Sequence, residues 1–221
     1  DDDIEGDGGP GDTGSDPGDG VWGSLHGTVL SPSGTIPIPG ALVYVTLTEA
    51  PEIPDGVFCY ECEDMTGKNW TLSEPDGTWS MPEAPSGDWY VVVRKGMFQR
   101  ARQVTINADS HLDVPLEYTT LPRENGADGL DQIPNYAVLL AHPDQIYNLL
   151  AKFGMGDMSA SGLIFGTETF DAFSDDVTQS GCPSSTELFA DQATLDHYHM
   201  IFLPCYASAT GTAFASTKHE M

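Results

Sequence analysis

The stretch from residue 75 to residue 96 constrains the fold more than any other part of the chain. Residues 78–81 alternate polar and apolar side chains, and residues 89–94 form an aromatic and β-branched run, which are both strand patterns. Proline, serine and glycine between residues 82 and 88 favour a turn, and the Pro-Asp-Gly of residues 75–77 favours another. The stretch therefore predicts consecutive antiparallel strands, that is, a β-meander.

Similar strand patterns occur on both sides of the meander. We expect strands at residues 24–30, 41–48, 100–106 and 111–116, and a hairpin within residues 57–71. Seven or so short strands, with turn residues every eight to twelve positions, are typical of an antiparallel β-sandwich. We expect the sandwich domain to span residues 21–120, with Trp79 and Trp89 largely in its interior; an exposed aromatic platform for a ligand is the alternative.

The two halves of the meander also carry a family resemblance. The order DGTW (residues 76–79) followed by SGDWYVVV (residues 86–93) resembles the centre of the carboxypeptidase regulatory-like domains, which are small sandwiches of transthyretin-like architecture. Residues 27–29 and 38–45 fit the first half of the same pattern, so the resemblance covers about residues 21–118. It implies a fold and no activity, because such modules are usually attached to other domains.

A different pattern begins near residue 135, after a predicted linker at residues 121–134. Residues 136–141 are continuously apolar, as in a strand covered on both faces, and residues 145–153 have helical spacing that ends at Gly154. A short strand at residues 169–173, a helix start at Ser184 and a strand at residues 200–203 complete a β-α-β-α-β order. We therefore predict a two-domain chain in which a partial α/β unit occupies residues 135–221.

This second unit resembles the first half of a flavodoxin-like or class I glutamine-amidotransferase-like domain. Domains of that type carry a nucleophilic cysteine on a later, glycine-flanked elbow, and the chain reaches Met221 before such an element. We therefore assign no catalytic residue. Doubly wound sheets commonly use five or more strands, so three strands are expected to leave an edge that a partner or a second copy covers.

The charge of the chain excludes some classes of partner. The 221 residues contain 34 Asp and Glu but only 8 Lys and Arg, a net charge of −26. Such a surface repels phosphate backbones and anionic lipids, so a nucleic-acid partner is not expected. No apolar run approaches the roughly 18 residues of a membrane span. Protein partners or self-association remain, and the first residue, an Asp, suggests a processed, exported chain.

Residues 1–20 combine acids, glycine and proline with a single aliphatic side chain, so they cannot bury enough apolar area to fold alone. We interpret them as a flexible tether. The tether resembles the acidic spacer that follows the lipid-modified cysteine of bacterial surface lipoproteins, which implies a lipid anchor upstream of the chain. Calcium is the alternative interpretation, with Asp1, Asp3, Asp7 and Asp12 as oxygen ligands, although the complete EF-hand pattern is absent.

The four cysteines suggest two local disulfides in an exported protein. Cys59 and Cys62 form a CxxC pair that also suits half of a metal site or a redox centre, although neither the further metal ligands nor the helical setting is evident. Cys182 and Cys205 are the second predicted pair. As an alternative, His142 and Cys205 both follow parallel strands and could meet as a dyad at the switch point of the sheet.

Four of the eight basic residues lie within nine positions, at Arg94, Lys95, Arg100 and Arg102. We interpret them first as edge-strand charges that discourage strand addition, and the alternative is docking of an acidic partner or of the tether. The sequence as a whole favours an exported, surface-associated interaction protein without a catalytic role. The alternatives are a regulatory fragment of a larger secreted hydrolase or amidotransferase-like enzyme, and a calcium- or metal-dependent adhesin.

Overall fold

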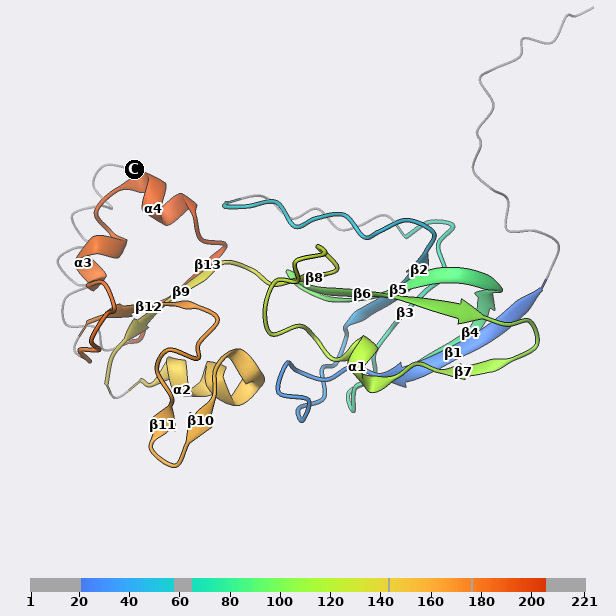
Figure 1. Cartoon of the computed structure of the whole chain (residues 1–221), viewed down its shortest axis with the longest axis horizontal. Helices are drawn as coiled ribbons and strands as arrows, with labels where there is room; N and C mark the ends of the chain where they lie inside the picture. The colour runs from blue at the N-terminus through green and yellow to red at the C-terminus, as the bar shows by residue number, and fades with distance from the viewer. Residues whose placement is uncertain (1–20, 58–64, 143, 176, 206–221) are drawn as a thin grey trace, which may run out of the picture.

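The computed structural model describes residues 21–57, 65–142, 144–175 and 177–205, and it places them in two units that lie side by side (Figure 1). The first unit is a β-sandwich, and the second is built around a small parallel sheet. Strands outnumber helices throughout, and every described helix is short. None of these helices is long and apolar enough to cross a membrane.

Two sheets make up the sandwich. The first has the order β4-β1-β7, with β1 at Trp22–Thr28, β4 at Thr78–Pro85 and β7 at His111–Asp113. The second has the order β3-β2-β5-β6-β8, with β2 at Leu42–Thr46, β3 at Trp70–Leu72, β5 at Gly87–Lys95, β6 at Phe98–Ile106 and β8 at Asp131–Gln132. A one-turn helix, α1 at Leu116–Thr119, follows β7. The predicted sandwich is therefore confirmed at the level of architecture.

Alternating side chains from both sheets form the core of the sandwich. Leu25, Trp79 and Met81 of the first sheet meet Val43 and Val91 of the second, and all five are buried. This pattern is what a period of two produces on the face that contacts the core, while Tyr44, Val92 and Ala101 form a separate buried cluster on the other face of the second sheet. Trp79 is 3% exposed and so belongs to the interior, as predicted.

The predicted meander of residues 75–96 is not formed, because β4 pairs with β1 in the first sheet while β5 pairs with β2 and β6 in the second. The sandwich differs from the sequence prediction in further respects. β4 continues to Pro85 because Ala84 is buried in the core, so the expected turn over residues 82–88 shrinks to its last positions. β1 pairs with β7 in parallel, whereas an entirely antiparallel sandwich was expected. The predicted linker also contributes to the fold, because β8 pairs with β6. Trp89 is only partly buried and packs against the edge of the core.

The second unit has β9 at Tyr136–Leu140 in its centre, with β12 at Asp171–Ser174 and β13 at Met200–Phe202 parallel to it on either side. Helix α2 at Ile146–Leu150 continues into a wide turn, η1 at Ala151–Met155, and a small hairpin follows, with β10 at Met158–Ser159 and β11 at Gly162–Leu163. Helices α3 at Ser185–Leu188 and α4 at Gln192–Asp196 precede β13. The predicted strand sequence is therefore present, with helices of only four or five residues.

The side chains of β9 explain its continuous apolar sequence. Val138 and Leu140 pack on the side of α2 and η1, while Ala137 and Leu139 pack on the opposite side against α3. Because both faces are covered, all five residues of β9 are buried. The structure thus confirms a strand buried on both faces, but the short helices do not support the finer flavodoxin-like assignment.

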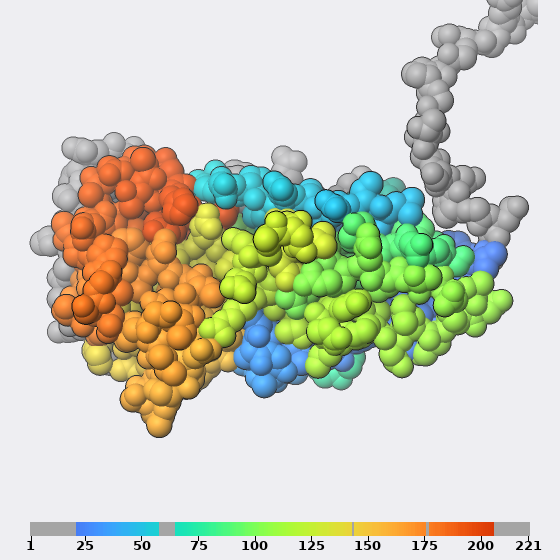
Figure 2. All heavy atoms as spheres, viewed as in Figure 1, coloured from blue at the N-terminus to red at the C-terminus, as the bar shows by residue number. Residues whose placement is uncertain are grey.

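Backbone hydrogen bonds and an ion pair join the two units. Ser33 N–H donates to Phe153 O at 2.9 Å, and Val57 N–H donates to Asp196 O at 3.2 Å. Arg123, in the segment between the units, binds Asp157 at 2.8 Å. Figure 2 shows the resulting contact, with the yellow-green segment 121–134 lying across the junction. The sandwich therefore covers part of the second unit within the same chain. From the sequence, a partner or a second copy was expected to provide this cover.

Gly154 allows this close approach. Its φ is 105°, and a Cβ at this position would lie 2.2 Å from Ser33 N and 2.5 Å from Pro32 C. Both atoms are backbone atoms that cannot rotate away. Glycine is therefore required at this point, where it ends the helix and also lets the sandwich loop contact η1.

Candidate functional site

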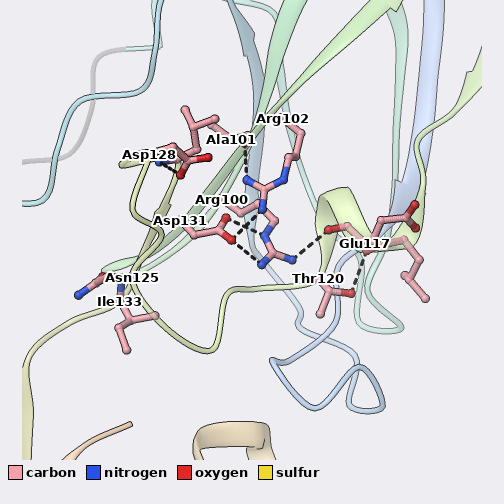
Figure 3. Close-up of polar contacts among 11 residues, drawn as sticks. Arg100, Ala101, Arg102, Glu117, Thr120, Asn125, Asp128, Asp131 and Ile133 are labelled. Carbon is pink, nitrogen blue, oxygen red and sulfur yellow. Dashed lines mark hydrogen bonds and ion pairs between the residues drawn. The ribbon is translucent and has the colours of Figure 1, made fainter.

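The clustered basic residues of the sandwich are bound to a carboxylate within the chain (Figure 3). Arg100 makes a two-pronged contact with Asp131 of β8, with Nε and a terminal nitrogen each 2.8 Å from a carboxylate oxygen. Arg102 donates to the same carboxylate at 2.7 Å. Arg100 also donates to Glu117 O at 2.9 Å, which ties β6 to α1.

The two arginines of this cluster shift the pKa of Asp131. Partial burial alone would raise the pKa of Asp131, but hydrogen bonds and charges from Arg100 and Arg102 outweigh burial and lower this pKa. The carboxylate is therefore ionised across the physiological range. It joins β8 to β6 through side chains, because one carboxylate binds two guanidinium groups that would otherwise repel each other.

The other two basic residues also have partners in the chain. Lys95 Nζ donates to Pro39 O at 2.7 Å and to Gly40 O at 3.1 Å. Arg94 is buried, and its Nε donates to Gly96 O at 3.2 Å. The basic cluster thus has an internal structural role, and docking of an acidic partner is not needed to explain it.

The structure describes only part of the predicted cysteine and calcium chemistry. Cys59, Cys62 and the four tether aspartates lie outside the described residues, so those predictions stand as made. Cys182 and Cys205 are free thiols, so the predicted disulfide between them is not formed. The reason is visible in their surroundings, because Cys182 packs half-buried against the core of the second unit while Cys205 is exposed after β13.

The predicted meeting of loops at the carboxyl edge of the parallel sheet does occur. The backbone N–H of Cys205 donates to Asp144 Oδ2 at 2.9 Å, which joins the segment after β13 to the segment after β9. His142 lies exposed in the latter segment. The structure therefore brings the two loops together, while a direct His142–Cys205 dyad remains a prediction.

An apolar groove lies at the junction of the two units. Its volume is about 220 Å³, and its lining residues are apolar apart from Ser31 and Lys95. Phe98 and Ile38 contribute from the sandwich, while Phe153, Met200 and Phe202 contribute from the second unit. Sequence reasoning missed this groove because its walls come from distant segments of the chain, which contacts such as those of Gly154 with Ser33 and of Val57 with Asp196 bring together.

A group of possible metal ligands was also missed. His26 of β1 lies beside His111 and Asp113 of β7, and one ligand atom from each lies within 4.8 Å of the others. The three residues are scattered in sequence, and their proximity depends on the parallel β1–β7 pairing that the sequence did not indicate.

Comparisons with known proteins give limited similarities. No family model and no curated protein matches the chain. Among solved structures, a putative carbohydrate-binding protein from Pseudomonas aeruginosa is 14% identical, with 46% of this chain and 88% of that chain covered and a TM-score of 0.34. The TIE protein of Bacillus anthracis is 15% identical, with 52% and 21% covered and a TM-score of 0.31.

A third solved structure, the major pilin subunit BcpA of Bacillus cereus, is 12% identical, with 46% of this chain and 30% of that chain covered and a TM-score of 0.30. The chain thus spans about a fifth of the Bacillus anthracis protein and under a third of the pilin subunit. Because these identities and TM-scores are low, function is inferred from the geometry of the chain itself.

Proposed function

We propose that the chain is an exported, surface-associated binding protein without a catalytic role, and that its junction groove receives an apolar segment of a partner protein. The observation that carries this proposal is the groove itself, whose apolar walls are contributed by both units. Concave apolar sites between domains are preferred places for binding. Export is supported by the acidic tether and the strongly acidic composition.

The size and chemistry of the groove favour side chains of a protein over other ligands. At about 220 Å³ it is smaller than the roughly 300–1,000 Å³ typical of drug-sized ligands. A sugar needs polar groups to replace its bonds to water, and the lining offers few, because Ser31 is buried and Lys95 Nζ already donates to Pro39 O and Gly40 O. One or two aliphatic or aromatic side chains of a peptide, by contrast, gain free energy from being buried against Phe98, Phe153 and Met200.

The charge of the chain specifies the rest of the partner segment. The net charge of −26 over the whole chain favours, at long range, a segment whose apolar anchor is flanked by lysine or arginine, while the charged residue among those lining the groove is Lys95. These flanking charges speed association, and salt weakens this electrostatic effect. The apolar anchor provides the contact that persists at high salt.

A peptide selection on the whole chain tests the proposal. Short random peptides are selected for binding, and their affinities are measured by fluorescence anisotropy on wild type, Met200→Glu and Met158→Glu. Met200 lines the groove and is 42% exposed, whereas Met158 lies on the β10–β11 hairpin and is 37% exposed, so the two variants are matched. Circular dichroism checks that each variant is folded.

We expect selected peptides to carry an aliphatic or aromatic anchor with basic neighbours. Met200→Glu should reduce their affinity about tenfold or more, because a carboxylate in an apolar groove is poorly solvated. Met158→Glu should leave affinity unchanged. Peptides that bind both variants as they bind wild type, or a selection that yields no binder, would contradict the proposal.

A further inference from the structure

The outer face of the β4-β1-β7 sheet gathers polar side chains from two strands. In the parallel pairing of β1 with β7, Ser24 lies beside His111 and His26 lies beside Asp113. Leu25, between them on β1, points into the core and is fully buried. Because side chains alternate along a strand, the four polar residues share the face opposite the core.

The two imidazole rings and the carboxylate are in contact on this face. The ring centroids of His26 and His111 are 3.5 Å apart, with an angle of 36° between the ring planes. His26 Nε2 contacts Asp113 Oδ1 directly. Asp113 is largely exposed and His26 is about a quarter exposed, so an ion can reach the group from solvent.

Ser24 orients the second histidine. Its hydroxyl contacts His111 Nδ1 at 2.8 Å and Ser110 O at 3.4 Å. The proposed site uses the tautomer in which His111 Nδ1–H donates to the Ser24 hydroxyl, while this hydroxyl donates to Ser110 O. This tautomer leaves the lone pair on His111 Nε2 available, which is the arrangement that second-shell partners impose on metal-binding histidines.

The hydrogen bonding of His26 is incomplete. Its Nδ1 is buried and has no hydrogen-bond partner among the described residues. Two imidazoles this close, with a carboxylate beside them, concentrate lone pairs and negative charge around one point. A cation held by one nitrogen of each ring and by the Asp113 carboxylate shares these lone pairs and this negative charge.

We propose that His26, His111 and Asp113 bind one divalent transition-metal ion of the zinc class on the outer face of the sandwich. The donor set is two nitrogens and one oxygen, which suits Zn²⁺ and its neighbours better than Ca²⁺, an ion that prefers oxygen ligands. The ion replaces the direct His26–Asp113 contact, and exposed Asp113 can turn to complete the site. Water or a partner's side chain takes the remaining position, as in sites with three protein ligands.

The site is independent of the junction groove, because its ligands lie on β1 and β7 and none of them lines the groove. Binding of metal and binding of a peptide can therefore succeed or fail separately. The strongly negative chain also attracts divalent cations in general, so the test must separate this site from diffuse binding.

Isothermal titration of Zn²⁺ into the full chain tests the proposal, with the cysteines alkylated and excess Ca²⁺ present to occupy sites made of carboxylates alone. The variants are His111→Gln, Asp113→Asn and Ser24→Ala, and the control is His197→Gln, an exposed histidine outside the group. Thermal melts without metal establish that each variant folds. Co²⁺ absorption in the visible range reports whether nitrogen ligands surround the ion.

We expect one Zn²⁺ per chain in wild type and in His197→Gln. His111→Gln and Asp113→Asn should lose affinity by about a hundredfold, and Ser24→Ala by about tenfold, as for other groups that orient a ligand. Should His111→Gln fail to fold, Asp113→Asn decides alone, because Asp113 is exposed. Equal zinc affinity in wild type and Asp113→Asn, or no binding by wild type, would overturn the proposal.

Discussion

Replacing Asp131 with asparagine should destabilise the sandwich by removing the charge that two arginines share. The Asp131 and Arg100 side chains are each 15% exposed, and the Arg102 side chain is 26% exposed. Breaking a fully buried pair costs roughly 3–5 kcal/mol, and breaking an exposed pair costs about 0–1 kcal/mol. This cluster is mostly buried, and asparagine can still accept one hydrogen bond. We therefore expect the free energy of unfolding to fall by about 2–3 kcal/mol.

The pH dependence of this loss follows from the pKa of Asp131. The arginines lower the folded-state pKa despite the opposing effect of burial, so the unfolded chain takes up a proton at higher pH than the folded chain does. The stabilisation is therefore complete above the ordinary aspartate pKa of about 3.9 and is lost as the pH falls through the lower folded-state pKa. The difference in unfolding free energy between wild type and Asp131→Asn should therefore shrink as the pH falls.

Urea unfolding of both proteins near neutral pH and in acid measures this effect. Asp157→Asn is the matched control, because Asp157 binds a single arginine, Arg123, and its side chain is 54% exposed. We expect this control to lose no more than about 1 kcal/mol. A loss for Asp131→Asn no larger than that of the control, or one that persists unchanged in acid, would refute the reasoning.

Three further predictions concern the core, the junction and the thiols. Trp79→Ala should cost roughly 3–5 kcal/mol in urea unfolding because it empties a buried aromatic site; an unchanged midpoint would remove Trp79 from the core. Gly154→Ala should lower the melting temperature by several degrees. The backbone conformation of residue 154 accounts for a loss of about 1–2 kcal/mol in unfolding free energy, and the clash with Ser33 adds to this loss. An unchanged melting temperature would show that the junction is not closely packed. Alkylation of the native chain should label Cys205 faster than Cys182, whose pKa is raised by burial and by nearby Glu168; failure of both to react would indicate that they are paired.

The sequence predicted those parts of the fold that depend on local patterns. Residues 136–141 indicated a strand buried on both faces because such a strand has no polar side, and β9 is that strand. Gly154 ended the predicted helix, as its positive φ in the structure explains. Trp79 was placed in the core because alternation fixes which face of a strand is buried.

The parts that could not be predicted depend on pairings between distant segments. Nothing in residues 111–113 alone indicates a parallel pairing with β1, yet this pairing brings His26 to Asp113. Asp131 lies in a segment whose glycines and acids are typical of a linker, and the segment forms a strand through its pairing with β6, where Asp131 also binds Arg100 and Arg102. The candidate sites are therefore visible only once the strand order is known.

The most direct test of the proposed function is hydrogen–deuterium exchange of the whole chain with and without a selected peptide. Bound peptide should slow exchange in segments that line the groove from both units, namely residues 31–38 and 98–99 in the sandwich and residues 150–155 and 200–202 in the second unit. Exchange in β7 should stay unchanged, because β7 lies on the first sheet and does not line the groove. Protection confined to one unit, or absent from these segments, would contradict a binding groove built jointly by the two units.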